Sequence, residues 1–368
     1  MKIECVKEKI TRAISQVEKV TGKNLTLQVL GCVLFDADKN NLTIRATNLD
    51  LGVELQIPVK VIEPGKVAVS ATVLNNLLSN IPGDKSIVFE TTDTNTLKVT
   101  SLKTSTVIKT LPHDDFPSIP RVAEDQAIKI NSGDFVKGLK SVWYAASVSS
   151  VKPELSSVYI AASDDDHLIF AATDSFRLAE KRIRFKKGGL GDHILIPFKN
   201  IPEIVRLLGD VNDEITIFVT KNQISFSHAS LYLTSRVIDG VFPDYKQIIP
   251  ASAATEATVL KQDLVQALKV ANIFSDKFNQ VNVSVAPSKK NFEIKTTNAD
   301  VGESVNKIDA VLTGEDVTVN FNHKYITDSF QSFEADSLSL SFNSINRPLV
   351  IRGVGDKSFL YLVMPMNR

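Results

Sequence analysis

LIFAATDSFRLAE, residues 168–180, has the pattern of two β-strands separated by the polar pair Thr173-Asp174. Apolar and alternating residues on either side of the pair are typical of strands. The pattern recurs earlier as LTIRATNLDLGVE (42–54) and later as FEIKTTNADVGES (292–304). Its threonines, at positions 47, 173 and 297, lie 126 and 124 residues apart. A repeat of domain length predicts that this chain contains three copies of one domain fold.

The first copy is expected to contain two helices and a series of short strands. Apolar residues from Ile10 to Val20 recur at spacings of three and four and precede Gly22, which predicts a helix over about 7–21. Ser70 is a candidate N-cap for a second helix, which should end near Pro82-Gly83. Strands are expected at 2–5, 31–35, 42–47, 51–61, 86–90, 96–101 and 105–111.

The second and third copies repeat this order. Phe116-Pro117 and Phe242-Pro243 are 126 residues apart, and proline cannot donate to a strand ladder, so both sites indicate linkers. The predicted fold class is α+β: three repeated domains, each with antiparallel sheets and two helices on one face. The expected domains are 1–122, 123–251 and 252–368. Further helices are expected from Ser132 or Asp134 and over 199–208, 261–274 and 322–333.

Composition excludes several classes of protein. The 42 basic and 42 acidic residues cancel, so no overall field attracts nucleic acid, and any basic surface must be local. Cys5 and Cys32 are too few for a disulfide framework or a cysteine-rich zinc site. The charged start MKIECVKEKI is unlike a signal peptide, and no run of 18 apolar residues predicts a membrane span. We therefore expect a cytoplasmic protein with no membrane partner.

Four motifs in order and phase closely resemble the bacterial DNA polymerase III beta subunits, the beta sliding clamps. They are ATDSFRLA (172–179), DGVFPDY (239–245), HDDFP (113–117) and YLVMPM (361–366). The resemblance covers the full chain. It implies a head-to-tail homodimer closed into a ring of six like domains, with helices lining the hole. Such a ring encircles double-stranded DNA without reading its sequence, and tethers the replicative polymerase to the template. It implies no catalysis and no cofactor.

The resemblance also implies DNA-facing positions on the helices. Diffuse contacts from Lys and Arg to phosphate would let DNA slide, whereas base readout would stop it. Basic residues on a helix are otherwise usually a solvated face, and that alternative stays open for these positions. The implied DNA-binding residues are Arg12, Lys23, Lys137, Lys199 and Arg206.

A peptide pocket between the second and third domains is implied for the replicative polymerase's alpha-type subunit, the clamp loader and other factors. Apolar walls, methionines and a few polar groups suit a peptide groove. Leu155, Leu178 and Val363 could instead be ordinary core. Ser175-Phe176 and Gln247 depart from the family's common residues, so peptide preference could differ. The implied lining is Leu155, Thr173, Ser175, Phe176, Arg177, Leu178, Pro243, Gln247, Ile248, Tyr325, Pro348, Leu362, Val363, Met364, Pro365 and Met366.

Ring closure is expected to join an edge strand of copy one to an edge strand of copy three, since unpaired edges favour such pairing. The implied interface residues are Lys103, Thr106 and Ile108 on one side and Ile273 and Phe274 on the other. Ile273 and Phe274 could equally be helix core.

Two other functions compete with this reading. Asp164-Asp165-Asp166-His167 could be an enzyme's acid–base or metal cluster, but it lies between two strands, where a polar hairpin turn is expected. Gly188-Gly189-Leu190-Gly191 lacks the Lys-Ser/Thr of a phosphate loop. A non-DNA-binding repeat scaffold is the second alternative.

Overall fold

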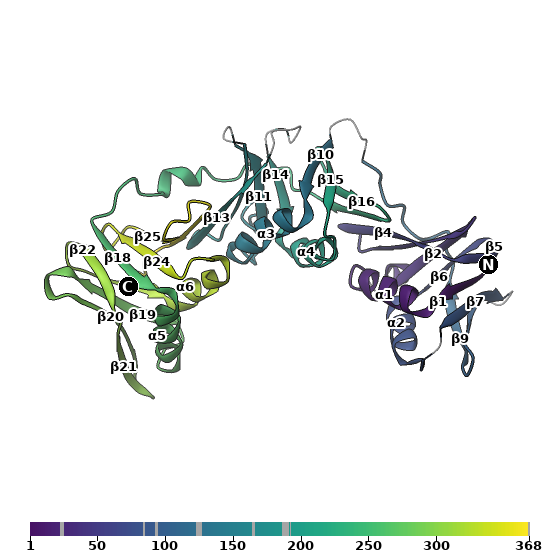
Figure 1. Cartoon of the computed structure of the whole chain (residues 1–368), viewed down its shortest axis with the longest axis horizontal. Coiled ribbons are helices and arrows are strands. Elements are labelled where there is room, and N and C mark those ends of the chain that lie inside the picture. Colours follow the sequence, from purple (N-terminus) through teal and green to yellow (C-terminus); the bar gives the residue numbers. More distant parts are fainter. Residues whose placement is uncertain are drawn as a thin grey trace. The chain divides into compact units, whose positions relative to one another are not determined.

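The computed structural model describes residues 1–22, 26–83, 85–92, 95–122, 127–163, 166–185, 191 and 193–366. The chain forms two compact units (Figure 1). The first combines residues 1–133 with 199–237, and the second combines 134–198 with 238–368. Each unit has its own sheets and helices and is described by itself below.

The first unit is built on a 13-stranded antiparallel sheet, in the order β10-β15-β16-β17-β4-β3-β2-β6-β9-β8-β7-β1-β5 (Figure 1). Strands of copy two therefore continue the sheet of copy one, through the pairing of β17 with β4. The strands are β1 (Lys2–Val6), β2 (Cys32–Asp38), β3 (Asn41–Thr47), β4 (Leu51–Pro58), β5 (Lys60–Glu63), β6 (Gly65–Ser70), β7 (Ser86–Thr92), β8 (Thr96–Thr100), β9 (Ser105–Leu111), β10 (Ala127–Asn131), β15 (Glu214–Val219), β16 (Gln223–His228) and β17 (Leu231–Arg236).

Three helices cover this sheet: α1 (Lys7–Glu18), α2 (Ala71–Asn80) and α4 (Ile201–Gly209). The predicted apolar face of α1 is buried against α2, β3 and β4. Ser70 caps α2 as expected, because its side chain accepts a hydrogen bond from the Val73 N–H. The expected end of α1 near Thr21 was wrong. The helix stops at Glu18, and the Gly22 N–H donates instead to the Leu30 carbonyl, at 2.8 Å.

The second unit contains a nine-stranded sheet, β14-β11-β12-β13-β26-β25-β24-β18-β22, and a four-stranded sheet, β21-β20-β19-β23. Both are antiparallel, and β26 of copy three pairs with β13 of copy two. The strands are β11 (Ser157–Ala162), β12 (His167–Thr173), β13 (Arg177–Arg184), β14 (Ile194–Pro197), β18 (Thr255–Leu260), β19 (Gln280–Ala286), β20 (Asn291–Asn298), β21 (Gly302–Lys307), β22 (Ala310–Gly314), β23 (Val317–Asn322), β24 (Ser337–Phe342), β25 (Leu349–Gly353) and β26 (Phe359–Val363).

Its helices lie against these sheets (Figure 1). Helix α5 (Lys261–Ile273) contacts β20 and β21, and α6 (His323–Ser329) contacts β23 and β26. Helix α3 (Ser132–Val142) leads into a 3-10 turn, η2 (Trp143–Ala145), which contacts β12 and β13. Other 3-10 turns are η1 (Gln28–Gly31), η3 (Phe198–Asn200), η4 (Tyr245–Ile248), η5 (Pro287–Lys289) and η6 (Phe330–Ser332). The predicted α+β class with antiparallel sheets is confirmed.

The turn between β3 and β4 has the same hydrogen bonds as the turn between β12 and β13. The Thr47 hydroxyl donates to the Leu51 carbonyl at 2.9 Å, and the Thr173 hydroxyl donates to the Arg177 carbonyl at 2.7 Å. In both turns the second residue after the threonine has a left-handed backbone, with φ of 78° at Leu49 and 77° at Ser175. The third turn departs from this pattern, because Thr297 is exposed.

The chain's contiguous domain boundaries stay a prediction from the repeat, since the compact units follow the sheets instead. No helix in the described ranges is long and apolar enough to cross a membrane.

Replacing Gly138 by alanine should destabilise the second unit. A Cβ there would lie 2.5 Å from Cε2 of Phe170, whose fully buried ring packs edge-on against Phe135 with centroids 5.4 Å apart. Because the ring has no room to move, Gly138→Ala should lower the free energy of unfolding by about 1–3 kcal/mol.

The matched control is Gly209→Ala at the end of α4, where no atom lies within 4 Å of the added Cβ. Thermal and urea unfolding should show that this variant is at least as stable as the parent chain. Equal stability of the two variants would contradict the packing described for Phe170.

Candidate functional sites

The turn after β12 is rigidly held by Asp174. Its Oδ1 accepts hydrogen bonds from the N–H groups of Phe176, at 2.9 Å, and Arg177, at 3.0 Å. Its Oδ2 accepts from Nε of Arg177, at 2.9 Å. One carboxylate therefore fixes both the backbone of the turn and the side chain that follows it. The Phe176 ring is left exposed at the edge of the turn.

Arg177 links this turn to helix α6. Its Nη1 donates to Oδ2 of Asp328 at 2.6 Å, and its guanidinium carbon lies 4.7 Å from the centre of the Tyr325 ring. The Tyr361 hydroxyl on β26 donates to the Tyr325 carbonyl at 2.7 Å. With only 12% of the Arg177 side chain exposed, this cation is a structural link rather than a free surface charge.

The C-terminal residues continue along the same turn. Strand β26 pairs with β13 up to Val363, and the Met364 N–H then donates to the Phe176 carbonyl at 2.8 Å. The Met366 N–H donates to the Asn320 carbonyl at 2.8 Å. Met364, Pro365 and Met366 are half-buried. Met364 packs against a buried apolar cluster that includes Leu178 and Leu362.

The segment 239–249 packs against the same apolar cluster, through Phe242 and Tyr245. The Tyr245 hydroxyl donates to Oε2 of the buried Glu180 at 2.6 Å, and the Phe242 ring stacks on Tyr159 with centroids 4.9 Å apart. Burial, the charge of Glu180 and the hydrogen bond to it raise the pKa of Tyr245, so its hydroxyl stays a donor at neutral pH. Pro243, Gln247 and Ile248 remain exposed on this anchored segment.

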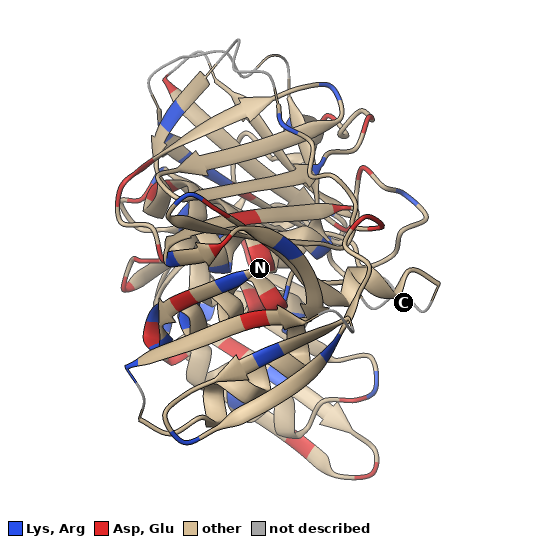
Figure 2. Cartoon of the chain, turned by 90° about the vertical axis from the view of Figure 1, so that its right-hand side faces the viewer, with Lys and Arg blue, Asp and Glu red and all other residues tan. Residues whose placement is uncertain are grey.

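The candidate DNA-facing cations differ in how firmly they are paired. Arg12 is 71% exposed, and its nearest carboxylate oxygen, Oδ2 of Asp210, is 4.0 Å away. Lys199 Nζ lies 2.6 Å from Oδ2 of Asp50, and Lys137 Nζ lies 2.5 Å from Oε1 of Glu334. Figure 2 shows acidic and basic residues interspersed along the visible strands and loops.

Arg206 is the most constrained of these cations. It is 27% exposed, its Nε donates to Oε2 of Glu203 at 2.7 Å, and its Nη2 donates to the Gln16 carbonyl at 2.5 Å. It therefore joins α4 to α1 within the first unit. Lys23 lies outside the described residues.

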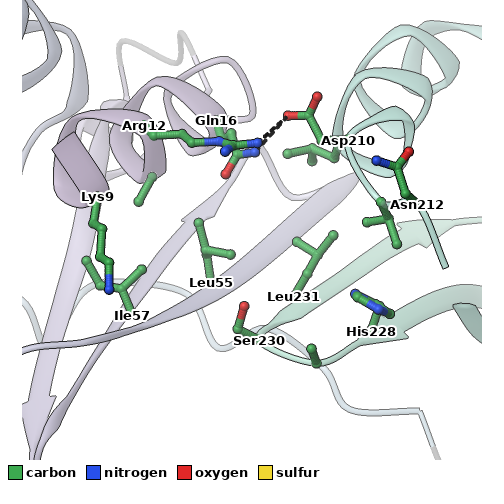
Figure 3. A pocket seen from close by; sticks show the side chains of 14 residues that line it. Lys9, Arg12, Gln16, Leu55, Ile57, Asp210, Asn212, His228, Ser230 and Leu231 are labelled. Carbon is green, nitrogen blue, oxygen red and sulfur yellow. Dashed lines mark hydrogen bonds and ion pairs between the residues drawn. The ribbon is translucent and has the colours of Figure 1, made fainter.

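Between α1 and the end of α4 the first unit has a hollow of about 350 Å³ (Figure 3). Its floor is formed by apolar side chains of β4 and β17, among them Leu55, Ile57 and Leu231. Arg12 and Gln16 extend from α1 toward Asp210 across its rim (Figure 3). Lys9 lines the same hollow, so two cations of α1 border it.

Several strands of the described sheets have an unpaired edge, among them β9 and β21. β9 pairs with β8 over Ser105–Lys109 and with β6 at Thr110 and Leu111, so the second edge of Ser105–Lys109 has no strand partner among those described. β21 is the outer strand of the four-stranded sheet.

Comparison with known proteins decides the family. Models of the DNA polymerase III beta subunit match residues 1–120 (N-terminal domain), 129–244 (central domain) and 246–367 (C-terminal domain). The chain belongs to the DNA polymerase III beta subunit family. A beta sliding clamp of Synechocystis sp. is 28% identical over 389 aligned residues, covering 100% of this chain and 99% of that one.

Solved structures agree with this assignment. The DNA polymerase sliding clamp of Bacillus subtilis is 25% identical with a TM-score of 0.93, covering 100% of this chain and 99% of that one. The beta chain of Streptococcus pneumoniae DNA polymerase III is 22% identical with a TM-score of 0.95 and 100% coverage of both chains, which supports the fold alone. The resemblance found in the sequence and the three-domain clamp fold are confirmed. A repeat scaffold unrelated to DNA is not favoured.

The structure brings together part of the peptide lining that the clamp family implies. Phe176 meets Met364, Arg177 meets Tyr325, and Leu178 shares a cluster with Leu362. Leu178 and Leu362 belong to the buried core and also support the half-buried Met364, so a core role and a role beneath the lining apply together. Leu155, Thr173, Leu178, Pro348, Leu362 and Val363 are buried, whereas Ser175, Pro243, Gln247 and Ile248 are exposed.

Sequence reasoning missed the residues that hold this lining in place. Asp328 and Tyr361 bind through contacts far apart in the chain, and no local pattern marks them. Glu180 did carry a signal, since Glu54 occupies the same place in copy one and is equally buried.

The acidic cluster considered for an enzyme falls partly on Asp164 and Asp165, outside the described residues. Within the described ranges, no group of three or more His, Cys, Asp and Glu could hold a metal ion.

Asp174→Ala should cost about 2–3 kcal/mol of stability, because it removes an acceptor for two backbone N–H groups and for the charged Arg177. Asp174→Asn keeps the Oδ1 acceptor, as Asn48 does in copy one, and should cost about 1 kcal/mol. Urea denaturation of both variants measures the difference. Equal losses would show that the backbone bonds of the turn are unimportant.

Proposed function

We propose that this DNA sliding clamp works as a closed homodimeric ring that holds duplex DNA by enclosure. The observation that carries the proposal is the repeated junction between copies. The strand after each Thr turn pairs with the last strand of the following copy: Gly52 lies opposite Thr234, and Leu178 lies opposite Leu362. In copy three the corresponding strand is β21, whose outer edge is open.

The partner for β21 is β9 of a second chain. β9 is the last strand of copy one and holds the place that β17 and β26 hold in copies two and three. Carrying the repeat spacing forward sets Gly302 opposite Ile108 of the partner chain and Ser304 opposite its Thr106. Edge strands readily add a strand in this manner. Lys103 precedes β9, and Ile273 and Phe274 end α5, which contacts β21.

Ile273→Asp should dissociate the dimer. Ile273 is 65% exposed in the single chain, so the substitution does not disturb the core, whereas an aspartate buried in an interface costs about 2–4 kcal/mol. The dimer Kd should rise by roughly 30- to 1,000-fold.

Light scattering across a dilution series measures this change. Val354→Asp, at an exposed apolar residue of the turn after β25, is the matched control and should leave the dimer intact. A wild-type chain that is monomeric at micromolar concentration would contradict the closed ring.

DNA passes through the ring in contact with a few cations rather than a continuous basic surface. Arg12, with its loose ion pair, and Lys199, on the exposed side of its pair with Asp50, can turn toward a phosphate. Lys137 and Lys23 contribute through the same family positions. Arg206 acts mainly by holding α4 to α1, because its donors are already taken by protein acceptors. Weak, exchangeable phosphate contacts leave the DNA free to slide.

Combined Arg12→Ala and Lys199→Ala should shorten retention on open-ended duplex DNA and reduce its salt dependence. Each lost phosphate contact should lower the slope of log affinity against log salt concentration by about 0.9. Residence times measured over a range of potassium chloride concentrations test this. Lys129→Ala, on the exposed face of β10, is the control. Unchanged residence times in the double variant would remove these residues from the DNA path.

Short linear peptides of replication partners, including the polymerase and the clamp loader, bind in a groove. The groove is formed by the turn 173–177, the segment 239–249 and the C-terminal residues. Apolar walls that are already anchored reduce the ordering cost of binding. Each buried leucine or phenylalanine of a peptide gives roughly 1.5–3 kcal/mol, so two anchors give weak, exchangeable binding. The clamp itself is a non-catalytic subunit in this scheme.

Deleting residues 364–368 should abolish peptide binding and leave the dimer intact. The deletion removes the wall held by the Phe176 and Asn320 carbonyls but preserves β26, which ends at Val363. Fluorescence anisotropy with a labelled polymerase peptide measures binding, and light scattering measures the dimer. Full-strength binding by the truncated chain would refute this placement of the groove.

A further inference from the structure

A second small cavity lies in the first unit, at the turn that repeats the turn of the peptide groove. Its volume is about 120 Å³, and its lining includes Thr47, Gly52 and Pro117. Thr47 and Pro117 correspond through the internal repeat to Thr173 and Pro243 of the groove. We call this cavity the copy-one pocket. It is the place where the first two copies form the same junction that the second and third copies form at the groove.

The backbone hydrogen bonds show how the two sites correspond. The Arg236 N–H donates to the Asp50 carbonyl at 2.8 Å, and the Met364 N–H donates to the Phe176 carbonyl, also at 2.8 Å. Asp50 and Phe176 are three residues after their threonines. Arg236 therefore occupies the position of Met364, and the copy-one pocket has a guanidinium where the groove has a thioether.

The strand register extends this correspondence. Thr234 lies opposite Gly52 as Leu362 lies opposite Leu178, so two large apolar groove residues are replaced by smaller ones. A Cβ added to Gly52 would come within 3.1 Å of Ile119 Cγ2. Ile119 and Thr234 thus take the space that a side chain at position 52 would need, and both line the pocket.

The charges at the pocket favour an anion. Arg236 is exposed and has no carboxylate partner in the part of the chain that the structure describes. Lys199 and Asp50 form an ion pair at 2.6 Å beside it, so the nearby charges sum to one excess cation. Leu49, held out by its left-handed backbone, is a half-exposed apolar side chain on the rim.

We propose that the copy-one pocket is a second peptide acceptor, selective for an acidic segment. A carboxylate of the peptide pairs with Arg236, for which a guanidinium supplies two parallel donors. One small apolar side chain packs between Leu49 and the prolines of the segment 117–120. The choice of a peptide rests on the proposed role of the groove, from which this site differs by its charge.

The test uses the full-length chain and two fluorescein-labelled, amidated probe peptides with one small apolar residue each, Ser-Val-Asp-Gly-Glu-Gly and its uncharged match Ser-Val-Asn-Gly-Gln-Gly. Anisotropy titrations should show the acidic probe binding at least about tenfold more tightly than the uncharged one. Arg236→Ala should weaken the acidic probe by about tenfold. Arg184→Ala, at another exposed arginine, and Met364→Ala, in the groove, should each leave acidic-probe binding unchanged.

A converse substitution makes the assignment sharper. Arg236→Met gives the pocket the residue of the groove and should reverse the preference, so that the uncharged probe binds at least as well as the acidic one. The proposal would be overturned if the Arg236 variants bound the acidic probe as tightly as the parent chain does. It would also be overturned if Met364→Ala weakened acidic-probe binding instead. An Arg236-dependent site that favours a short DNA duplex over the acidic probe would also overturn it, because the ligand would then be phosphate.

The two proposals fail in different ways. If the groove is misplaced, deletion of residues 364–368 leaves polymerase-peptide binding intact. If only the copy-one pocket is wrong, that deletion still abolishes polymerase-peptide binding while Arg236 variants bind the acidic probe like the parent chain.

Discussion

Antiparallel pairing between β4 and β17, and again between β13 and β26, is the interaction on which the rest of this structure depends. It joins the strand that follows a Thr turn to the last strand of the next copy. Because backbone groups make these bonds, the junction needs the turn and the register but tolerates different side chains. The same junction therefore supports a buried apolar cluster around Leu178 and Leu362 at one place and a pocket lined by Arg236 at the other. In the proposed ring, β21 pairs with β9 of a second chain and forms one more junction of this kind.

A ring closed in this way explains why the surface charge is so balanced. With 42 basic and 42 acidic residues, the chain has no net field that would concentrate it on DNA. Most of the candidate DNA-facing cations are already paired with carboxylates in their own unit. A protein that bound DNA by affinity would need these cations free, whereas one that holds DNA by topology needs few of them. Weak contacts are then an advantage, since strong ones would resist sliding.

Much of the fold could be predicted from the sequence, because its signals are local. Alternating residues marked the strands, Ser70 marked a helix start, and the equal spacing of the Thr turns revealed the three copies. The cross-copy sheets were not predicted, since strand pairing between residues such as Gly52 and Thr234 depends on distant parts of the chain. For the same reason the contact between Arg177 and Asp328 was missed. The end of α1 was placed too late, because Val20 continues the apolar pattern although the backbone has already left the helix.

The central claim is that two chains close around DNA and hold it without strong affinity. The most direct measurement loads the dimer with a clamp loader onto a nicked DNA circle, removes free protein by gel filtration, and then linearises half of the sample with a restriction enzyme. Enclosure predicts that the clamp stays on the intact circle and leaves the linear DNA by sliding off its ends. Equal loss from the circular and linear forms would contradict the account.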